Sequence, residues 1–256
     1  MKIKPEKIVE ADFTEPVEAY SGKITEVKLG ATKAEGGTRG KTVTIGGETA
    51  PAFYTFEKPT PHLPAVAIDV FDMKVSLPRA VKIHVTEVLE DPASWAKLAV
   101  ERFEADLVTL HLVSADPLLK DASPREAVKT VEAVAQAVNV PLIIGGCGDS
   151  KKDAANFAAV AEAFAGERFL ISSITRTMDV KKCTAFIKKY GHVALSFTPM
   201  DLNLARELNR MLLESLPSDC IVMDLTTAAL GYGLDYSFTV MEQARLAALK
   251  GDAELA

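Results

Sequence analysis

The residues with the most distinctive pattern are the glycines around Cys147. The segment Gly145–Asp149 lies between a short apolar run and an alanine-rich amphipathic stretch. This order predicts a buried strand, a tight turn and a helix. Because glycine has no Cβ, a bulky group can approach the backbone there. The segment lacks the phosphate-loop patterns GxxxxGK[ST] and GxGxxG. It is therefore either a turn with Asp149 or Ser150 as the helix cap, or a turn that also borders a ligand.

Thiol, metal and cluster chemistry have little support in the sequence. No basic residue lies beside Cys147 to lower the pKa of its thiol, and the spacing of Cys147, Cys183 and Cys220 contains no CxxC pair. An iron–sulfur cluster needs about four thiolates, so we do not expect this chain to hold one alone. The four histidines show no metal-ligand spacing. We therefore expect no catalytic residue and no metal ligand in this chain.

Other polar residues follow the predicted strands at their ends. In a parallel α/β fold these ends meet at one face, where ligands bind. The residues at the strand ends are Asp69 and Asp72; His111, Ser114 and Asp116; Gly145, Gly146, Cys147, Gly148 and Asp149; Ser172, Ser173 and Thr175; Ser196 and Thr198; and Asp224, Thr226 and Thr227. This set suits many hydrogen bonds to a large polar ligand and is poor in groups for proton transfer. We expect His111 to line the sheet, and Asp224 to bond either a backbone N–H or a ligand.

Strands and helices must alternate to position these residues. Apolar runs predict strands at Ala65–Val70, Leu107–Ser114, the residues before Gly145, Phe169–Thr175, His192–Thr198 and Ile221–Thr226. Helical patterns cover Ser94–Phe103, Ser123–Val138, the stretch to Phe164, Val180–Tyr190, Leu202–Leu216 and about Tyr236–Lys250. Near-continuous apolar strands between helices predict a parallel sheet.

We predict a TIM (β/α)8-type barrel, with a doubly wound open sheet as the second choice. The repeat yields six βα units, and Ala253–Ala256 resembles the approach to a seventh strand. A complete barrel needs eight units, so we expect the last one to two to be missing from this chain.

The first part of the chain has a different pattern. Lys23–Leu29 and Lys41–Ile45 alternate apolar and polar residues, which predicts a β-hairpin, and Ala52–Phe56 is a candidate third strand. The tip Lys33–Arg39 is expected to be solvated, or to order against a partner chain. A proline-rich stretch ends at Pro64. We therefore divide the chain into residues 1–62, the hairpin extension and linker, and residues 63–256, the barrel.

The composition is that of a soluble globular protein. Of the 256 residues, 48% are hydrophobic and 25% charged, and the formal net charge is −6. No basic run is present, which argues against nucleic acid as a partner. No apolar run reaches the length of about 18 residues that a membrane span needs. The sparse cysteines fit a reducing, cytoplasmic compartment.

Several of these segments together resemble a known family. GGCGDSKKDA and TTAALGYGLDYSFTVMEQAR, with VALSFTPMDLNLARELNRML, resemble the small (delta) subunit of the corrinoid/iron–sulfur protein of the carbon monoxide dehydrogenase/acetyl-CoA synthase system. The resemblance covers essentially the whole chain.

The resemblance implies a TIM barrel, without turnover of its own, that holds a cobalamin-type corrinoid together with a large subunit. That large partner carries the [4Fe–4S] cluster. The corrinoid cobalt takes a methyl group from methyltetrahydrofolate on a separate methyltransferase and delivers it to acetyl-CoA synthase. The strand-end residues from Gly146 to Thr227 given above are our candidates for corrinoid contact, assigned by geometry.

Two other functions remain open. One is a free-standing barrel enzyme such as a pterin-dependent methyltransferase, for which Asp69, Asp72 and Asp224 supply part of an acidic set. An aldolase would need a strand-end lysine, and none is present. The other is a purely structural subunit that binds protein only.

Overall fold

Six strands form one parallel sheet whose order follows the sequence. The computed structural model describes residues 18–51, 60–226, 231 and 233–256. The strands are β3 (Ala67–Phe71), β4 (Leu107–His111), β5 (Leu142–Gly145), β6 (Leu170–Ile174), β7 (Val193–Phe197) and β8 (Ile221–Asp224). Each pairs in parallel with the next, in the order β3-β4-β5-β6-β7-β8. All six predicted strands are confirmed, with ends that differ by at most three residues.

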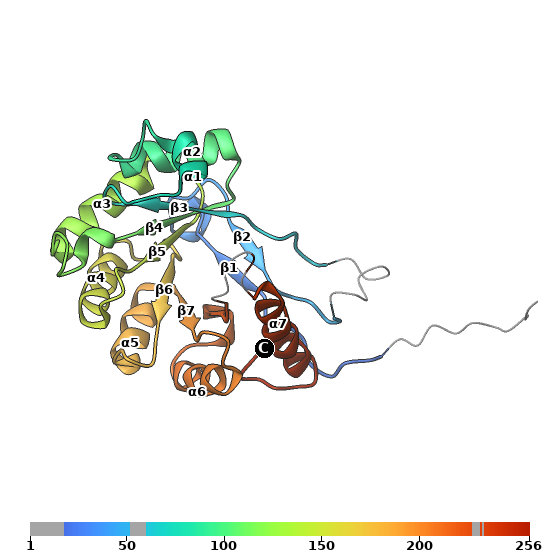
Figure 1. The fold of residues 1–256 in the computed structure, drawn as a ribbon. Coiled ribbons are helices and arrows are strands. Elements are labelled where there is room, and N and C mark those ends of the chain that lie inside the picture. Colours follow the sequence, from blue (N-terminus) through green and yellow to red (C-terminus); the bar gives the residue numbers. More distant parts are fainter. Residues whose placement is uncertain (1–17, 52–59, 227–230, 232) are drawn as a thin grey trace, which may run out of the picture.

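The helices in the described residues are α1 (Arg79–Val85), α2 (Pro92–Phe103), α3 (Pro124–Ala137), α4 (Ser150–Ala163), α5 (Val180–Tyr190), α6 (Leu202–Leu213) and α7 (Leu234–Leu249). Helices α2 to α6 pack along the outer side of the sheet, whereas α7 packs with Ala205 of α6 in a separate cluster. Figure 1 shows α2 to α6 as an arc around the strands. Fully buried residues such as Val131, Phe157 and Leu208 meet the outward-facing Leu110, Ile144 and Ile171 in one core.

The sequence sets the limits of these helices through caps. Ser123 accepts a hydrogen bond from the Glu126 N–H, with Pro124 at the first helical position of α3. The carboxylates of Asp149, Asp179 and Asp201 cap α4, α5 and α6 in the same way. Since these helices follow β5, β6 and β7, their N-termini are already filled by the chain's own carboxylates.

The β-hairpin predicted before the sheet is present and closes the N-terminal end of the strands. Strands β1 (Val27–Leu29) and β2 (Val43–Ile45) pair antiparallel. Val27 and Leu29 are buried against Leu107, Leu170 and Val193, the first residues of β4, β6 and β7. The hairpin is therefore part of the folded body, and Figure 1 shows it beside α7.

The prediction that the hairpin tip is solvated is wrong at Arg39. This side chain is buried and forms a 3.0 Å ion pair with Glu167. It also donates to the carbonyls of Val138 and Ala135, at 2.8 and 2.9 Å, near the C-terminus of α3. The carbonyl end of a helix favours a cation, and the carboxylate compensates the buried charge. Lys33 remains exposed, as expected.

The structure confirms the parallel α/β sheet but not a closed barrel. Among the described residues β3 pairs only with β4 and β8 only with β7. Six strands are too few for the eight-stranded closure that the prediction assumed. The order contains no reversal, unlike that of a doubly wound sheet. The expected approach to a strand at Ala253–Ala256 is a turn, and the candidate strand Ala52–Phe56 lies outside the described residues.

Candidate functional site

The carboxyl ends of neighbouring strands meet at one face of the sheet. Pairing places Phe71 beside His111, His111 beside Gly145, and Gly145 beside Ser172. Residues two apart in a strand share a face. Asp69, Thr109 and His111 therefore face the same concave side, opposite to the helices. Below, this side at the strand ends is called the concave face.

The glycine turn after β5 is built around a buried carboxylate. Asp153 in α4 is 4% exposed and accepts hydrogen bonds from the backbone N–H groups of Cys147 and Gly148, at 2.7 and 2.9 Å. A Cβ on Gly146 would lie 2.3 Å from the carboxylate carbon of Asp153. Asp149 caps α4, as one of the two sequence interpretations proposed. The group that lies close to Gly146 is therefore the Asp153 carboxylate. Contact between this turn and a ligand remains a prediction.

The cysteine in this turn is a poor nucleophile. Burial raises the pKa of the Cys147 thiol to about 11, and the nearby Asp153 carboxylate adds to the shift. Burial also raises the pKa of Cys183 to about 11, and it raises the pKa of Cys220. All three thiols are therefore protonated at neutral pH, and none of them is activated as a thiolate.

Hydroxyl groups gather at the ends of β5 and β6. Ser172 accepts a bond from the Gly146 N–H through its carbonyl, and its side chain is half-buried, as is that of Ser173. Thr175 Oγ1 lies 2.8 Å from Thr177 Oγ1, which lies 2.6 Å from Ser150 Oγ. These groups form a short hydroxyl chain next to the glycine turn.

Two predicted site residues are buried away from this face. Ser196 and Thr198 are each 1% exposed. Ser196 is two residues after Ala194, which packs in the core with Leu208 of α6, so Ser196 faces the helices. Neither hydroxyl has a hydrogen-bond partner among the described residues. We therefore do not carry these two residues into the proposed site.

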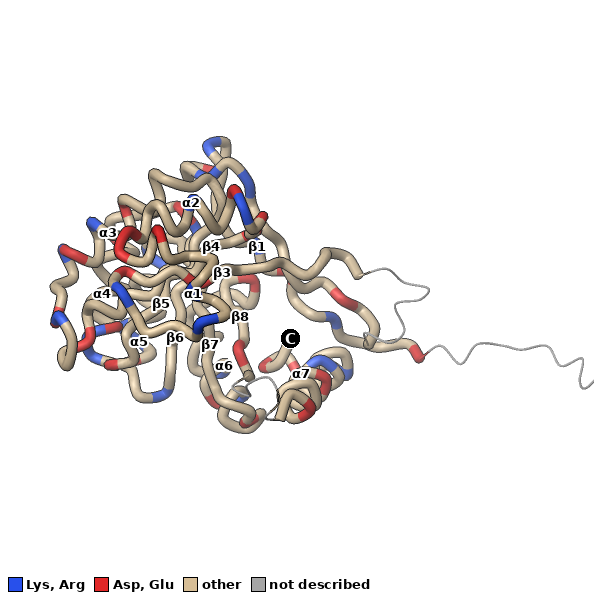
Figure 2. Tube along the Cα trace, turned by 45° about the horizontal axis from the view of Figure 1, so that its top comes forward, with Lys and Arg blue, Asp and Glu red and all other residues tan. Residues whose placement is uncertain are grey.

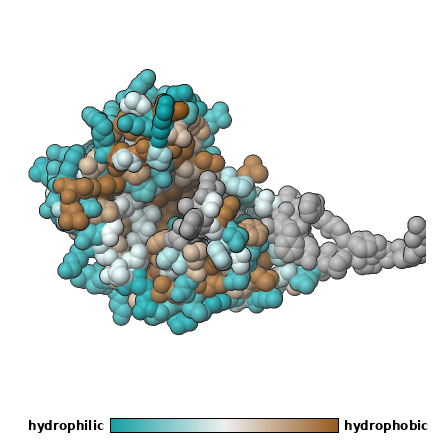
Figure 3. All heavy atoms as spheres, viewed as in Figure 1, coloured by the Kyte–Doolittle hydropathy of each residue, from teal (hydrophilic) through white to brown (hydrophobic). Residues whose placement is uncertain are grey.

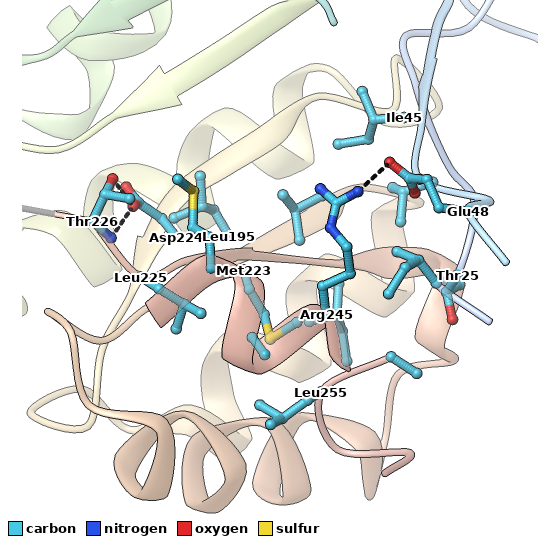
Figure 4. Close-up of a pocket in the computed structure, with 18 residues that line it drawn as sticks. Thr25, Ile45, Glu48, Leu195, Met223, Asp224, Leu225, Thr226, Arg245 and Leu255 are labelled. Atoms are coloured by element: carbon cyan, nitrogen blue, oxygen red, sulfur yellow. Dashed lines mark hydrogen bonds and ion pairs between the residues drawn. The ribbon is translucent and has the colours of Figure 1, made fainter. Parts of the chain in front are cut away.

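The end of β8 is organised by its own turn. Asp224 Oδ1 accepts from the Thr226 N–H at 2.9 Å and from its hydroxyl at 2.8 Å, as Figure 4 shows. This is the backbone bond that was one of the two expectations for Asp224. Thr227 lies outside the described residues.

A close carboxylate–imidazole contact on the concave face was absent from the predicted contact set. His111 Nε2 lies 3.2 Å from Asp69 Oδ1, and this interaction holds the pKa of Asp69 below its usual value. The neighbouring Asp72 accepts from the Ser114 N–H at 2.8 Å and from its hydroxyl, while burial raises its pKa. His111 does line the sheet, as expected. Polar residues at alternate positions of β3 and β4 were the signal that could have found this pair.

A cavity lies beside β8, separate from the glycine turn. Its volume is about 440 Å³, and β8, α7 and the hairpin line it. Figure 4 shows Arg245 of α7 reaching toward Glu48, with 3.5 Å between Nη1 and Oε1. Most of the lining is apolar, including Ile45, Leu195 and Leu255.

The surface of the protein carries mixed charge and several exposed apolar side chains. Figure 2 shows both signs of charge interspersed over the outer helices. Exposed apolar side chains include Leu118 and Leu119 after β4, and Tyr236 and Phe238 in α7. Figure 3 shows hydrophobic residues gathered at a hollow between the α1–α2 region and the region of α7. Large exposed apolar groups of this kind mark interaction surfaces.

Two kinds of feature are absent from the part of the chain that the structure describes. There, no group of three or more His, Cys, Asp or Glu side chains is arranged to hold a metal ion. None of the helices in that part is both long and apolar enough to cross a bilayer.

The fold and the concave face define a parallel, singly wound α/β protein in which a ligand would meet the carboxyl ends of the strands. Comparison with known proteins then gives the family. Residues 26–256 match the family described as CO dehydrogenase/acetyl-CoA synthase delta subunit, and the chain belongs to this family. This confirms the resemblance found in the sequence.

Curated relatives show the same relationship. The acetyl-CoA decarbonylase/synthase complex subunit delta of Archaeoglobus fulgidus is 55% identical over 253 residues, which are 98% of this chain and 56% of the relative. Subunit delta 1 of Methanosarcina thermophila is 50% identical over 92% of this chain and 54% of its own length. Subunit delta of Methanocaldococcus jannaschii is 46% identical over 98% and 62%. The chain thus spans a little over half the length of these relatives.

Proposed function

We propose that this protein is the corrinoid-holding delta subunit of a methyl-carrier protein in the reductive acetyl-CoA pathway. The observation that carries the proposal is the 55% identity to a delta subunit over 98% of this chain. The concave face supports it, because its hydroxyls, carboxylates and backbone groups offer many hydrogen-bond partners and the thiol beside them, Cys147, is not activated. In this role the protein binds and orients its ligand and has no turnover of its own.

The residues present fit the periphery of a corrinoid. A corrin ring carries amide side chains that both donate and accept hydrogen bonds. Ser172 and Ser173, Thr175, the edge of the Gly146–Asp149 turn and Thr226 offer matching groups after β5, β6 and β8, and the exposed carboxylate of Asp69 adds an acceptor. The cobalt of the bound group would carry the methyl group. This chain's residues would orient the ring and shield it from water.

The proposed partners follow from the family and from the apolar surface. We propose a large corrinoid/iron–sulfur subunit that carries the [4Fe–4S] cluster and covers Leu118, Leu119, Tyr236 and Phe238, which are 54–91% exposed. A methyltetrahydrofolate methyltransferase would load the methyl group, and carbon monoxide dehydrogenase/acetyl-CoA synthase would receive it. We place the complex in the cytoplasm, since the three free cysteines fit a reducing compartment.

The proposed fold of the full-length protein is a (β/α)8 barrel. The sequential strand order, the helices along one side and the unpaired outer edges of β3 and β8 in the described residues support it. The apolar cavity lies beside the β8 edge, where a further strand would pack.

A pterin-dependent methyltransferase is the second candidate, and the acidic strand ends favour it. Asp69 accepts from His111, Asp72 from Ser114 and Asp224 from Thr226, so all three carboxylates already have protein partners. Asp69 is the most accessible of them in side-chain exposure, at 61%. One accessible carboxylate is a weaker pterin site than the acidic set that the sequence suggested.

The visible spectrum of the purified protein tests these functions. The full-length protein, alone and with its large partner, is supplied with corrinoid, and we expect coloured protein whose bands shift when the cobalt is reduced. A colourless complex would overturn the proposal. Methyl transfer from methyltetrahydrofolate by this chain alone would favour the pterin enzyme.

A further inference from the structure

Neighbouring strands place a carboxylate and an imidazole together on the concave face. Asp69 is in β3 and His111 in β4, and Nε2 and Oδ1 lie 3.2 Å apart. The Asp69 side chain is 61% exposed and that of His111 is 30% exposed, so a ligand at this face can reach both. The inward face of a barrel sheet is normally filled by branched apolar side chains, so this pair calls for a functional explanation.

The surrounding residues are shaped to hold the imidazole. The ring of Phe71 stacks on His111 with centroids 5.1 Å apart and planes 19° apart, and Trp95 packs against Phe71. On the other side, a Cβ on Gly145 would lie 2.6 Å from His111 Nδ1. The ring therefore occupies space that only glycine leaves free. Residues of three adjacent strands, β3, β4 and β5, therefore surround the His111 ring. A chance contact at the surface would not need such support.

The charge of this arrangement selects one ligand chemistry over another. Asp69 can accept further hydrogen bonds, and a charged acceptor bonds N–H donors strongly. A ligand carboxylate brought to this position would meet the Asp69 carboxylate, whereas a carboxamide would donate a hydrogen bond to it.

We propose that the Asp69–His111 pair recognises carboxamide groups of the ligand and discriminates against carboxylates at the same positions. This inference rests on the proposed corrinoid function and adds a specificity element to it. Asp69 makes the direct contact. His111 fixes the Asp69 carboxylate, and Gly145 and Phe71 fix His111.

Two probes that differ in this chemistry test the inference. Cobinamide carries carboxamides around the corrin ring, and cobyrinic acid carries carboxylates on the same ring. Each is titrated, by visible absorbance, into the full-length protein with its large partner. We expect the wild-type protein to bind cobinamide at least about tenfold more tightly than cobyrinic acid. Asp69→Asn should weaken cobinamide binding about tenfold or more and bring the two affinities close together.

Control variants separate recognition from folding. Asp106→Asn removes a carboxylate of similar setting at the opposite end of β4, where it accepts from the Val66 N–H at 3.0 Å, and should leave both affinities unchanged. Gly145→Ala keeps Asp69 but displaces the His111 ring, so it should reduce the preference for cobinamide as well. Thermal unfolding of each variant checks that the protein is folded.

The outcomes are distinguishable. Two results for folded Asp69→Asn would overturn this inference. One is an equal loss of affinity for both probes, and the other is an unchanged preference for cobinamide. Either result would leave the proposed corrinoid function standing. Failure of the wild-type complex to bind either probe would overturn the proposed function and this inference with it.

Discussion

The two ends of the parallel sheet are completed by different kinds of residue. At the N-terminal end the hairpin buries Val27 and Leu29 and seals the strands with the Arg39–Glu167 pair. At the C-terminal end the side chains are polar and half-buried, around the glycine turn and the Asp69–His111 pair. In barrel folds the first end serves stability and the second serves ligands. Substitutions at the two ends should therefore separate unfolding from binding.

The largest stability effect is expected at the hairpin end. Arg39→Met leaves Glu167 buried without its partner and should lower the free energy of unfolding by about 3–5 kcal/mol. Chemical denaturation measures this. Lys41→Met is the matched control, since its 3.4 Å pair with Asp106 is about half exposed and should contribute less than about 1 kcal/mol. Similar values for the two variants would contradict the role of the hairpin as the stabilising end.

Asp153 tests whether the glycine turn needs an internal anchor. Asp153→Ala leaves the N–H groups of Cys147 and Gly148 without their acceptor, and we expect a loss of about 3 kcal/mol. Hydrogen exchange of these two amides should accelerate. Asp179→Ala, which removes only a helix cap, should cost about 1 kcal/mol and leave both amides protected. Unchanged exchange in Asp153→Ala would show that the turn is held by other contacts.

The thiol in this turn offers a test by pH. With a pKa of about 11 against an ordinary 9.0, Cys147 holds about a hundredfold less thiolate near pH 8 than a free cysteine. Its alkylation by iodoacetamide, followed by mass spectrometry, should be slower in that proportion and rise tenfold per pH unit to about pH 11. The folded state binds this proton more tightly than the unfolded chain, so its contribution to stability is fully present below about pH 9 and is lost as the pH rises from there through about pH 11. A rate that levels off near pH 9 would contradict the burial.

The smallest effect is expected at Ser196. Ser196→Ala removes a buried hydroxyl without a partner among the described residues, so stability should change by no more than about 1 kcal/mol and corrinoid binding not at all. Ser172→Ala, on the concave face, should weaken corrinoid binding while stability stays similar. If Ser196→Ala weakened binding more than Ser172→Ala did, the assignment of faces would be reversed.

The helices and strands were predicted from the sequence better than the side of the sheet to which each strand residue points. Helix α5 was predicted at its observed limits, Val180–Tyr190, because Gly191 ends it in a left-handed conformation. Helix α1 was missed, since Arg79–Val85 is short and mostly exposed. In near-continuous apolar strands the pattern does not say which side a serine faces, so Ser172 and Ser196 looked equivalent.

Long-range partners explain the other differences. Arg39 looked solvated because Glu167 lies 128 residues later, and no local pattern connects them. The sequence analysis did not single out Asp153, because its partners are the backbone N–H groups of Cys147 and Gly148 in the preceding turn, which no side-chain pattern indicates. The Asp69–His111 pair joins two strands whose register the sequence does not give.

The hairpin also dictates an order of assembly. Its backbone bonds Arg168 through Gly30, Asn139 through Gly40, and Leu249 through Gly22. A ribosome releases the hairpin before its binding surfaces on β4, β6, β7 and α7, and α7 is synthesised about two hundred residues after β1. Contacts of such high sequence separation form slowly because loop closure must precede them. The hairpin therefore cannot dock until the strands and the helix that bury it have been synthesised.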